Sequence, residues 1–478
     1  MSAAVLRLRE LAGNVRGNVR WLPFETLTSE GRSKERHRRA ALTGGAAALA
    51  RIIAVSTSLV TIPAALHYLG TERFALWMTI SSVVALLGFA DFGMGNGVLN
   101  AVAEAHGRDD AEEIRRLVES GYVLLSAIAV VGMAVFVSVY HLADWARFLN
   151  VTSAAARRES GPSLAVFVGC FALNLPLGVV QRLQLGMQEG FLSNLWQLVG
   201  SVAGLAGVLL VIHFRMSLPC LILALAGAPA IAALANTLVF FGWMRPDLRP
   251  RFSLVSTIAM RKIARIGFLF FVLQAAVAIA YSSDNFVVAR MLGPEAVTCY
   301  AVTAKMFSLI SLGLSMFLAP LWPAYGEAIA RGDLLWVRRT LIKSLTTAVT
   351  LAAFAALILV ALGPSILRLW VHRPISPSFL LLLGLGLWSV MDAAGVSVAM
   401  FLNGANVVLP QVILASIFAA GCLALKIFLV RRFGMVGVPW ATLLSYAALS
   451  AIPCLFIVPR LLSSMERRHS GEWAARPY

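Results

Sequence analysis

Residues 68–110 read YLGTERFALWMTISSVVALLGFADFGMGNGVLNAVAEAHGRDD, and their pattern recurs in the second half of the chain. Without gaps, one constant offset aligns Gly70 with Gly293 and Arg108 with Arg331. The other main identities at this first offset are Glu72 with Glu295, Glu104 with Glu327, Asp110 with Asp333, and Arg115 with Arg338. Because most of these identities are charged, shared hydrophobicity does not produce them. The chain is therefore predicted to contain two copies of one structural unit.

The sequence around this stretch is that of an all-α polytopic membrane protein. Of its 478 residues, 59% are hydrophobic and 13% are charged, whereas soluble domains carry about 25% charged residues. Apolar runs of roughly 20 residues match the thickness of a bilayer core. About twelve such runs predict helices near 45–67, 74–102, 117–141, 162–181, 191–212, 218–243, 266–289, 296–322, 341–362, 379–402, 409–430 and 436–459.

These helices divide into two halves. We expect an N-terminal lobe at 45–243 and a C-terminal lobe at 266–459, joined by a cytoplasmic linker at 244–265 and flanked by tails at 1–44 and 460–478. Since each half has six helices, the copies are related by an axis along the membrane normal, and transporters of this kind place the substrate between the halves.

A second, slightly shorter offset extends the repeat into the later helices of each half. It aligns Gly190 with Gly404 and Gln197 with Gln411. We expect these helices to correspond at that second offset.

The net charge of +17 is explained by topology. With the N-terminus inside, 27 of the 40 Lys and Arg residues lie on the inner side and 10 on the outer side. The positive-inside rule then predicts that both termini are cytoplasmic. The basic tail is expected to contact anionic lipids, and no nucleic acid is expected as a partner, because the basic residues lie between spans.

Residues 68–110 resemble the second-helix region of the polysaccharide-transporter branch of the multidrug/oligosaccharidyl-lipid/polysaccharide flippase superfamily. This branch includes the Wzx-type O-antigen flippases. Residues 292–339 resemble the same region more weakly. The resemblance implies an inner-membrane protein with two lobes around a central cavity, lined largely by the first two helices of each half. It implies transport of an undecaprenyl-diphosphate-linked oligosaccharide to the periplasmic face, for O-antigen, capsule or exopolysaccharide synthesis. The implied partners are this substrate and polysaccharide polymerase or export proteins.

Charged side chains inside spans are costly and by default indicate function. Arg51, Asp91 and Lys305 lie on the helices that the resemblance places at the cavity, and the polar Gln274 lies there too. Arg51 and Lys305 are candidates for binding a diphosphate headgroup, and Asp91 and Gln274 are further candidates for the substrate. Arg51 and Asp91 are also at similar depth, so an ion pair that packs two helices explains them equally well.

Two further carboxylates are candidates for coupling transport to H⁺ or Na⁺. Asp284 lies on the first helix of the second half, and Asp392 on the tenth helix. Both are less clearly neutralised by a cation than Asp91 is, although Lys305 could pair with Asp284. We favour Asp284, because it lies on a helix that the resemblance places at the cavity, with Asp392 as the alternative. Hydrogen bonding alone is the simpler explanation for Asp392.

Glycines cluster around Asp91, at Gly88, Gly93, Gly95 and Gly97. Glycine allows close helix packing in membranes and also makes a helix easier to bend. Close packing is the preferred interpretation, and flexibility the alternative.

No ATP-binding, zinc-protease or hydrolase motif occurs in the sequence, so we expect neither an enzyme nor a cofactor or metal site. The five cysteines lie in or beside apolar runs without a CxxC pair. They are expected to be buried thiols. An ion-coupled drug exporter of the same superfamily is the main alternative function. A membrane ligase or polymerase is a weaker one, since its site usually needs a large outer loop.

Overall fold

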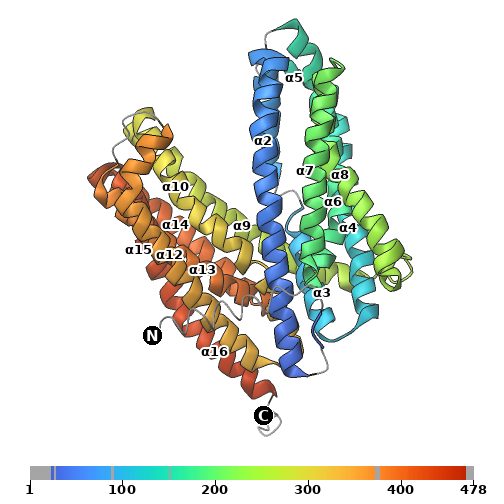
Figure 1. Cartoon of the computed structure of the whole chain (residues 1–478), viewed down its shortest axis with the longest axis vertical. Coiled ribbons are helices and arrows are strands. Elements are labelled where there is room, and N and C mark those ends of the chain that lie inside the picture. Colours follow the sequence, from blue (N-terminus) through green and yellow to red (C-terminus); the bar gives the residue numbers. More distant parts are fainter. Residues whose placement is uncertain are drawn as a thin grey trace, which may run out of the picture. The chain divides into compact units, whose positions relative to one another are not determined.

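The computed structural model describes residues 23–25, 28–87, 91–149, 151, 153–371 and 377–469. The described residues form helices and turns and contain no strand, as the sequence predicts (Figure 1). They divide into two compact units, Met1–Phe268 and Leu269–Tyr478, which are described separately below. The boundary falls close to the predicted start of the second lobe at residue 266.

The helices of the first unit are α2 (Ser29–Leu87), α3 (Met94–Gly107), α4 (Ala111–Tyr140), α5 (Trp145–Phe148), α6 (Ala154–Gly186), α7 (Gly190–His213) and α8 (Leu218–Val239). The helix α9 (Thr257–Leu292) begins in the first unit and continues into the second. The second unit adds α10 (Pro294–Leu318), α11 (Leu321–Ala330), α12 (Leu334–Val371), α13 (Phe379–Gly404), α14 (Val408–Phe433), α15 (Gly437–Tyr446) and α16 (Ile452–His469).

The described helices account for twelve membrane spans. Ten described segments are long and apolar enough to cross a bilayer. Two of them, Glu30–Ser81 and Val408–Arg467, contain 52 and 60 residues, whereas one crossing needs about 20. The first is divided by non-helical backbone at Gly70, and the second by a 3₁₀ turn at Gly434–Val436. The second segment therefore holds two crossings. The part of α2 after Gly70 is too short for one crossing and, together with α3, accounts for the second span, which agrees with the predicted number of about twelve.

The first span begins earlier than the apolar pattern predicts. α2 starts at Ser29, so most of residues 29–44, assigned above to a tail, are helical. Their charged side chains form local pairs: Glu35 binds Arg38 at 2.6 Å and Arg39 at 2.9 Å. The guanidinium of Arg39 also donates to the carbonyl of Met187 in the turn between α6 and α7. A hydropathy pattern misses this extension because ion pairs, not apolar residues, stabilise it.

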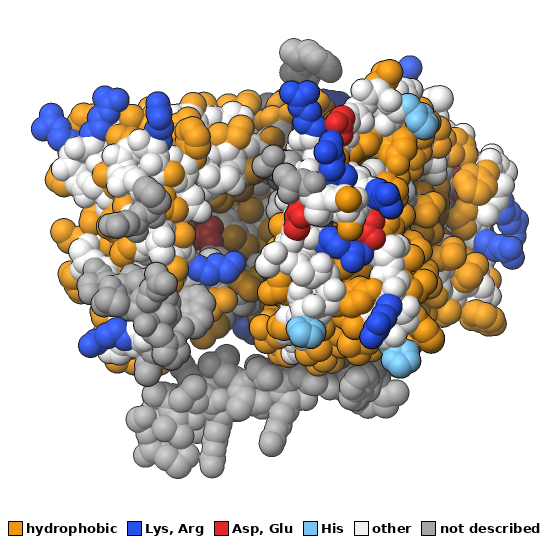
Figure 2. Space-filling view, turned by 90° about the horizontal axis from the view of Figure 1, so that it is seen from above, with side chains coloured by type: hydrophobic (Ala, Val, Ile, Leu, Met, Phe, Trp, Pro, Cys, Tyr) orange, Lys and Arg blue, Asp and Glu red, His pale blue; other side chains and the backbone are white. Residues whose placement is uncertain are grey.

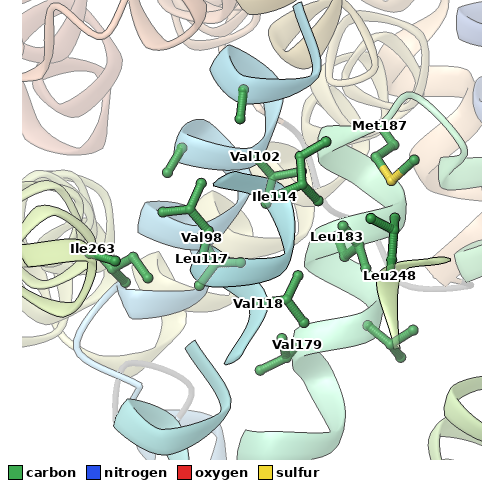
Figure 3. Close-up of a cluster of buried hydrophobic side chains, with 14 of the residues drawn as sticks. Val98, Val102, Ile114, Leu117, Val118, Val179, Leu183, Met187, Leu248 and Ile263 are labelled. Atoms are coloured by element: carbon green, nitrogen blue, oxygen red, sulfur yellow. The ribbon is translucent and has the colours of Figure 1, made fainter. Parts of the chain in front are cut away.

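The core of the first unit surrounds α3. Val98 and Val102 on α3 pack against Leu117 on α4 and Leu183 on α6 (Figure 3). Ile263 at the start of α9 joins the same cluster. The second half of the second span is therefore buried on several sides by its own unit.

The linker is fastened to α4 by a buried carboxylate. The Glu119 side chain has no exposed surface and accepts hydrogen bonds from the backbone N–H groups of Arg251 at 2.9 Å and Leu254 at 2.7 Å. The hydroxyl of Ser120 accepts from the N–H of Ser256 at 3.2 Å. Residues 251–256 are thus held against α4, although the sequence predicted only a cytoplasmic linker.

The two copies of the repeat share an unusual backbone turn. Gly70 has φ 72° and ψ 172°, and Gly293 has φ 87° and ψ 174°. This region of backbone conformation is essentially restricted to glycine. The first offset thus aligns two glycines that the fold requires for the same geometric reason.

The charged turns that follow also match at the first offset. Asp110 caps α4 by accepting from the N–H of Glu113 at 2.9 Å. Asp333 accepts in the same way from the N–H of Trp336 at 3.3 Å, just before α12. One turn earlier, Glu104 pairs with Arg108 and Glu327 with Arg331, both as i,i+4 ion pairs. The polar identities of the repeat therefore encode a helix end and the next helix start.

A close helix crossing recurs in both units. A Cβ on Gly186 of α6 would lie 3.0 Å from the carbonyl oxygen of Leu99 on α3. A Cβ on Gly404 of α13 would lie 2.7 Å from the carbonyl oxygen of Trp322 on α11. Leu99 and Trp322 are again related by the first offset. In each unit, glycine allows a long helix to touch the backbone of the short inner helix.

The predicted second offset is wrong by one helical turn. α6 ends at Gly186 and α13 at Gly404, and the positive-φ residues that follow are Gln188 and Asn406. Gly404 therefore corresponds to Gly186 and not to Gly190, and Asn406 corresponds to Gln188 at the same spacing. A shift by one turn leaves a helix face nearly unchanged, so apolar patterns do not distinguish the two alignments.

Candidate functional site

The second span is broken beside a carboxylate. α2 ends at Leu87 and α3 starts at Met94, and Gly93 at the N-cap has a left-handed backbone with φ 73°. The Asp91 side chain accepts from the N–H groups of Gly93 at 2.9 Å and Gly95 at 3.2 Å. A carboxylate stabilises the positive end of a helix. Asp91 therefore caps α3 within a membrane span.

Arg182 on α6 is a cation of this site that the sequence did not reveal. Its guanidinium donates to the Asn96 side chain at 2.9 Å and interacts electrostatically with Asp91. Both groups flank Gly95: a Cβ there would lie 2.7 Å from Arg182 Nε and 2.9 Å from Asp91 Oδ2. The apolar run was expected to end at residue 181, which left Arg182 in a loop. α6 continues to Gly186, and this places the charge inside the helix.

The proposed ion pair between Arg51 and Asp91 does not form. Asp91 is engaged by α3 and Arg182, as above, and the Arg51 side chain on α2 is exposed. No ion pair of Arg51 occurs within the described part of the chain. The explanation of Arg51 as an ion pair that packs two helices is therefore wrong.

Three of the four glycines near Asp91 lie in the described residues, and each has a different structural role. Gly93 supplies the left-handed backbone, and Gly95 makes room for Arg182. Gly97 contacts α9, where a Cβ would lie 2.4 Å from the carbonyl oxygen of Ile263. Gly88 lies outside the described residues. These contacts fit close packing at Gly95 and Gly97.

In the second unit, Asp284 of α9 has a cationic partner. The ammonium of Lys426 on α14 forms an ion pair with its carboxylate, and the hydroxyl of Tyr300 donates to Oδ2 at 2.6 Å. The Lys426 side chain is completely buried. The sequence did not indicate Lys426 as a partner of Asp284, because the two positions are far apart in the chain.

Lys305 and Gln274, the cavity candidates of the second half, have no such partner. The Lys305 side chain on α10 is exposed, and Gln274 on α9 is half-buried. Within the ranges that the structure describes, neither side chain has an ion pair or a side-chain hydrogen bond. Asp284 is engaged by Lys426 and not by Lys305.

Asp392 on α13 lies among hydroxyl and aromatic groups. Its Oδ2 accepts from the Ser311 hydroxyl at 2.6 Å, and it interacts electrostatically with Tyr281 and Tyr446. Trp388, one turn before it, stacks edge-on against Tyr446 at 5.4 Å between ring centroids. In the described residues no cation pairs with Asp392. Of Asp284 and Asp392, the described span carboxylates of this unit, Asp392 is the one without a cationic partner.

Charged groups outside the spans show ordinary electrostatics. Arg245 binds Asp247 at 3.0 Å, and this hydrogen bond lowers the pKa of the Asp247 carboxyl. Burial raises the pKa of Glu189 in the turn after α6, partly opposed by Arg39 and Arg245. Figure 2 shows Lys, Arg, Asp and Glu side chains among hydrophobic ones on the face seen from above, as expected where membrane spans end.

These features suit binding and movement of a solute. The described residues hold no group of three or more His, Cys, Asp or Glu side chains that could bind a metal ion. What they offer is an interrupted span with a capped inner helix, exposed cations on apolar helices, and two inequivalent carboxylates.

Comparison with known proteins agrees with this description. The family model described as "Polysaccharide biosynthesis protein" matches residues 44–328. A proposed O-antigen export protein of Yersinia pseudotuberculosis is 23% identical over 296 residues, covering 59% of this chain and 64% of that protein. A proposed O-antigen transporter of Salmonella typhimurium is 20% identical over 298 residues, covering 60% and 65%. The chain thus matches slightly less than two thirds of the length of these relatives.

Solved structures identify the fold. An outward-facing multidrug resistance MATE family transporter of the MOP superfamily superposes with a TM-score of 0.73 at 14% identity, covering 90% of this chain and 96% of the other. A MOP superfamily transporter from Pyrococcus furiosus gives a TM-score of 0.72 at 13% identity, covering 91% and 97%. The fold is that of the MATE transporters, and by its sequence match the chain belongs to the polysaccharide biosynthesis protein family.

Proposed function

We propose that this protein is a flippase that moves a lipid-linked oligosaccharide from the cytoplasmic to the periplasmic leaflet of the bacterial inner membrane. The observation that carries the proposal is the combination of a polysaccharide-biosynthesis sequence with a transporter fold. Folds built from two repeats of spans move solutes by alternating access. An undecaprenyl-diphosphate carrier is the expected form of the substrate, for synthesis of O-antigen, capsule or exopolysaccharide. Polymerase and export proteins are its expected functional partners.

Deletion of the gene in the native host tests this function. We expect loss of the surface polysaccharide and accumulation of its lipid-linked repeat unit on the cytoplasmic side, restored by the wild-type gene. An unchanged lipid-linked pool together with increased sensitivity to toxic compounds would contradict the proposal and favour the alternative, a drug exporter of the same fold.

The headgroup is proposed to meet the exposed cations of the spans. Arg51 on α2 and Lys305 on α10 are exposed and have no ion-pair partner among the residues that the structure describes. A diphosphate is a dianionic or more highly charged ligand that Arg binds bidentately. Asp91 and Gln274 are the polar groups proposed to contact sugar hydroxyls. The Asp91 carboxylate already accepts two backbone hydrogen bonds as the cap of α3, so only part of its capacity to accept hydrogen bonds remains for a ligand.

Coupling to a proton or sodium gradient is proposed to use Asp392 in preference to Asp284. A carboxylate that exchanges an ion during transport cannot be neutralised permanently by a neighbouring cation. Asp284 has Lys426 beside it, whereas Asp392 accepts from a hydroxyl. The contacts therefore reverse the preference drawn from sequence alone.

A vesicle assay with an imposed gradient tests the coupling residue. Asp392→Asn is expected to flip substrate at a rate that no longer responds to the gradient. Ser311→Ala is the matched variant: it removes the hydrogen bond but keeps the carboxylate, so the response should persist. If Asp392→Asn retains the wild-type response, coupling does not use this residue.

A further inference from the structure

The buried ammonium of Lys426 has three oxygen atoms of α9 around it, and the Cys422 thiol of its own helix is a further neighbour. The ammonium contacts the carboxylate of Asp284, the backbone carbonyl of Ala280 and, at 3.4 Å, the hydroxyl of Ser283. All three belong to one turn of α9. The Lys426 side chain is 0% exposed, and that of Asp284 is 21% exposed.

The far side of the carboxylate is fixed as well. The Tyr300 hydroxyl donates to Asp284 Oδ2 at 2.6 Å, and Tyr300 is itself 3% exposed. The carboxylate is therefore held by α10 on one oxygen and presents the other to α14. Its position does not depend on the ammonium alone.

The chemistry of these oxygen atoms is that of a site for a small hard cation. Carboxylate, carbonyl and hydroxyl oxygens are the ligands that such cations prefer, and transporters coordinate coupling ions with helix carbonyls and carboxylates. An ammonium group is a compact point charge that donates to oxygen. In this protein the position of the ion is taken by a cation that is covalently part of α14.

We propose that Lys426 is a built-in cation that occupies a sodium-type site on α9. The charge of Asp284 is then compensated without an ion from solution, and the wild-type protein binds no Na⁺ there. Shortening the side chain removes the ammonium and leaves the oxygen ligands around an open volume. Lys426→Ala should therefore convert this position into a Na⁺ site. This inference depends on the contacts of the second unit alone, so it stands or falls separately from the proposed flippase activity.

Binding of radioactive sodium ion to the purified full-length protein in detergent tests the proposal. Wild type is expected to show no saturable binding that depends on Asp284. K426A should bind the ion saturably, with unlabelled Na⁺ competing better than K⁺. The double variant K426A/D284N is the matched control, because it removes the ligand together with the ammonium, and its binding should be lost.

Two results would overturn the proposal. One is a folded, monodisperse K426A that binds no more Na⁺ than the double variant. The other is saturable binding by wild type that D284N abolishes. If K426A is poorly folded, its recovery in NaCl is compared with its recovery in the chloride of a large organic cation. Recovery that requires Na⁺ supports the proposal, and equal recovery in both salts contradicts it.

Discussion

Arg51 and Lys305 are exposed cations on apolar helices, and this makes them the most direct test of headgroup binding. A hydrogen bond to a charged group contributes about 1.5–3 kcal/mol, and about 1.4 kcal/mol corresponds to a tenfold change in affinity. Arg51→Ala and Lys305→Ala should therefore each reduce flipping in vesicles by about tenfold or more, without loss of membrane insertion or abundance.

Lys343→Ala is a suitable control for these variants, because this exposed lysine lies in the first half of α12 and has no proposed role. Arg51→Lys keeps the charge but not the bidentate geometry, so a partial loss is expected. Flipping at the wild-type rate in both alanine variants would remove the cations from the mechanism.

The sequence located the charged residues of the site but not their partners. Asp284 and Asp392 lie in helices that are long and apolar enough to cross a membrane, and Asp91 lies in the turn between α2 and α3. The sequence could point to these residues because a carboxylate in an apolar run is visible in any hydropathy pattern. Arg182 and Lys426 became partners through the packing of helices distant in sequence, which composition does not reveal. The ion pair expected between Arg51 and Asp91 was consequently assigned to the wrong cation, and the pair of Asp284 with Lys426 was not anticipated.

At the scale of helices, the crossings at Gly186 and Gly404 predict equivalent sensitivity in the two units. Alanine at either position would push against backbone atoms at 3.0 Å or less, and overpacking costs about 1–3 kcal/mol. Both variants should lower the midpoint of thermal unfolding and the yield of monodisperse protein.

The controls are glycines in helices with open space around the missing Cβ. Gly178 lies on α6 with Gly186, and Gly313 lies in α10 of the second unit; a Cβ added at either glycine would meet no atom within 4 Å. Alanine there should be neutral or stabilising by up to about 1 kcal/mol, since Ala is the better helix former. Equal effects at crowded and open glycines would mean that the crossings do not matter for stability.

The fastening of the linker gives a second prediction at this scale. Glu119→Ala leaves two backbone N–H groups without their acceptor, at about 1–3 kcal/mol each. Residues 251–256 should then detach from α4, and limited trypsin digestion should cut after Arg251 faster than in wild type. Glu112→Ala removes an exposed carboxylate from the same helix and should leave the digestion rate unchanged. An unaltered rate in Glu119→Ala would show that other contacts hold the linker.

For the whole molecule, an even number of spans requires both termini to lie on one side of the membrane. From the charge asymmetry we propose that this side is the cytoplasm. A green fluorescent protein fused after the last residue should fluoresce, and alkaline phosphatase fused there should be inactive. Active phosphatase at this position would reverse the proposed orientation.

The number of spans and the repeat were predictable because they depend on hydrophobicity and on polar identities at fixed spacing. The charged turns at Asp110 and Asp333 illustrate this, since the same residues cap helices in both units. The start of α2 at Ser29 and the correspondence of Gly186 with Gly404 were not predictable. The first depends on ion pairs, and the second on a choice between alignments one helical turn apart.

The helix α9 passes through the boundary of the two compact units without a break. Its first turns are pressed against α3 at Gly267, where a Cβ would lie 2.9 Å from the Cα of Met94, and the residues before it are fastened through Glu119. The linker between the halves is therefore not a flexible connection at residues 251–256 or at Gly267. The covalent connection from the first compact unit to the second is thus a continuous helix, which is much stiffer than a flexible linker.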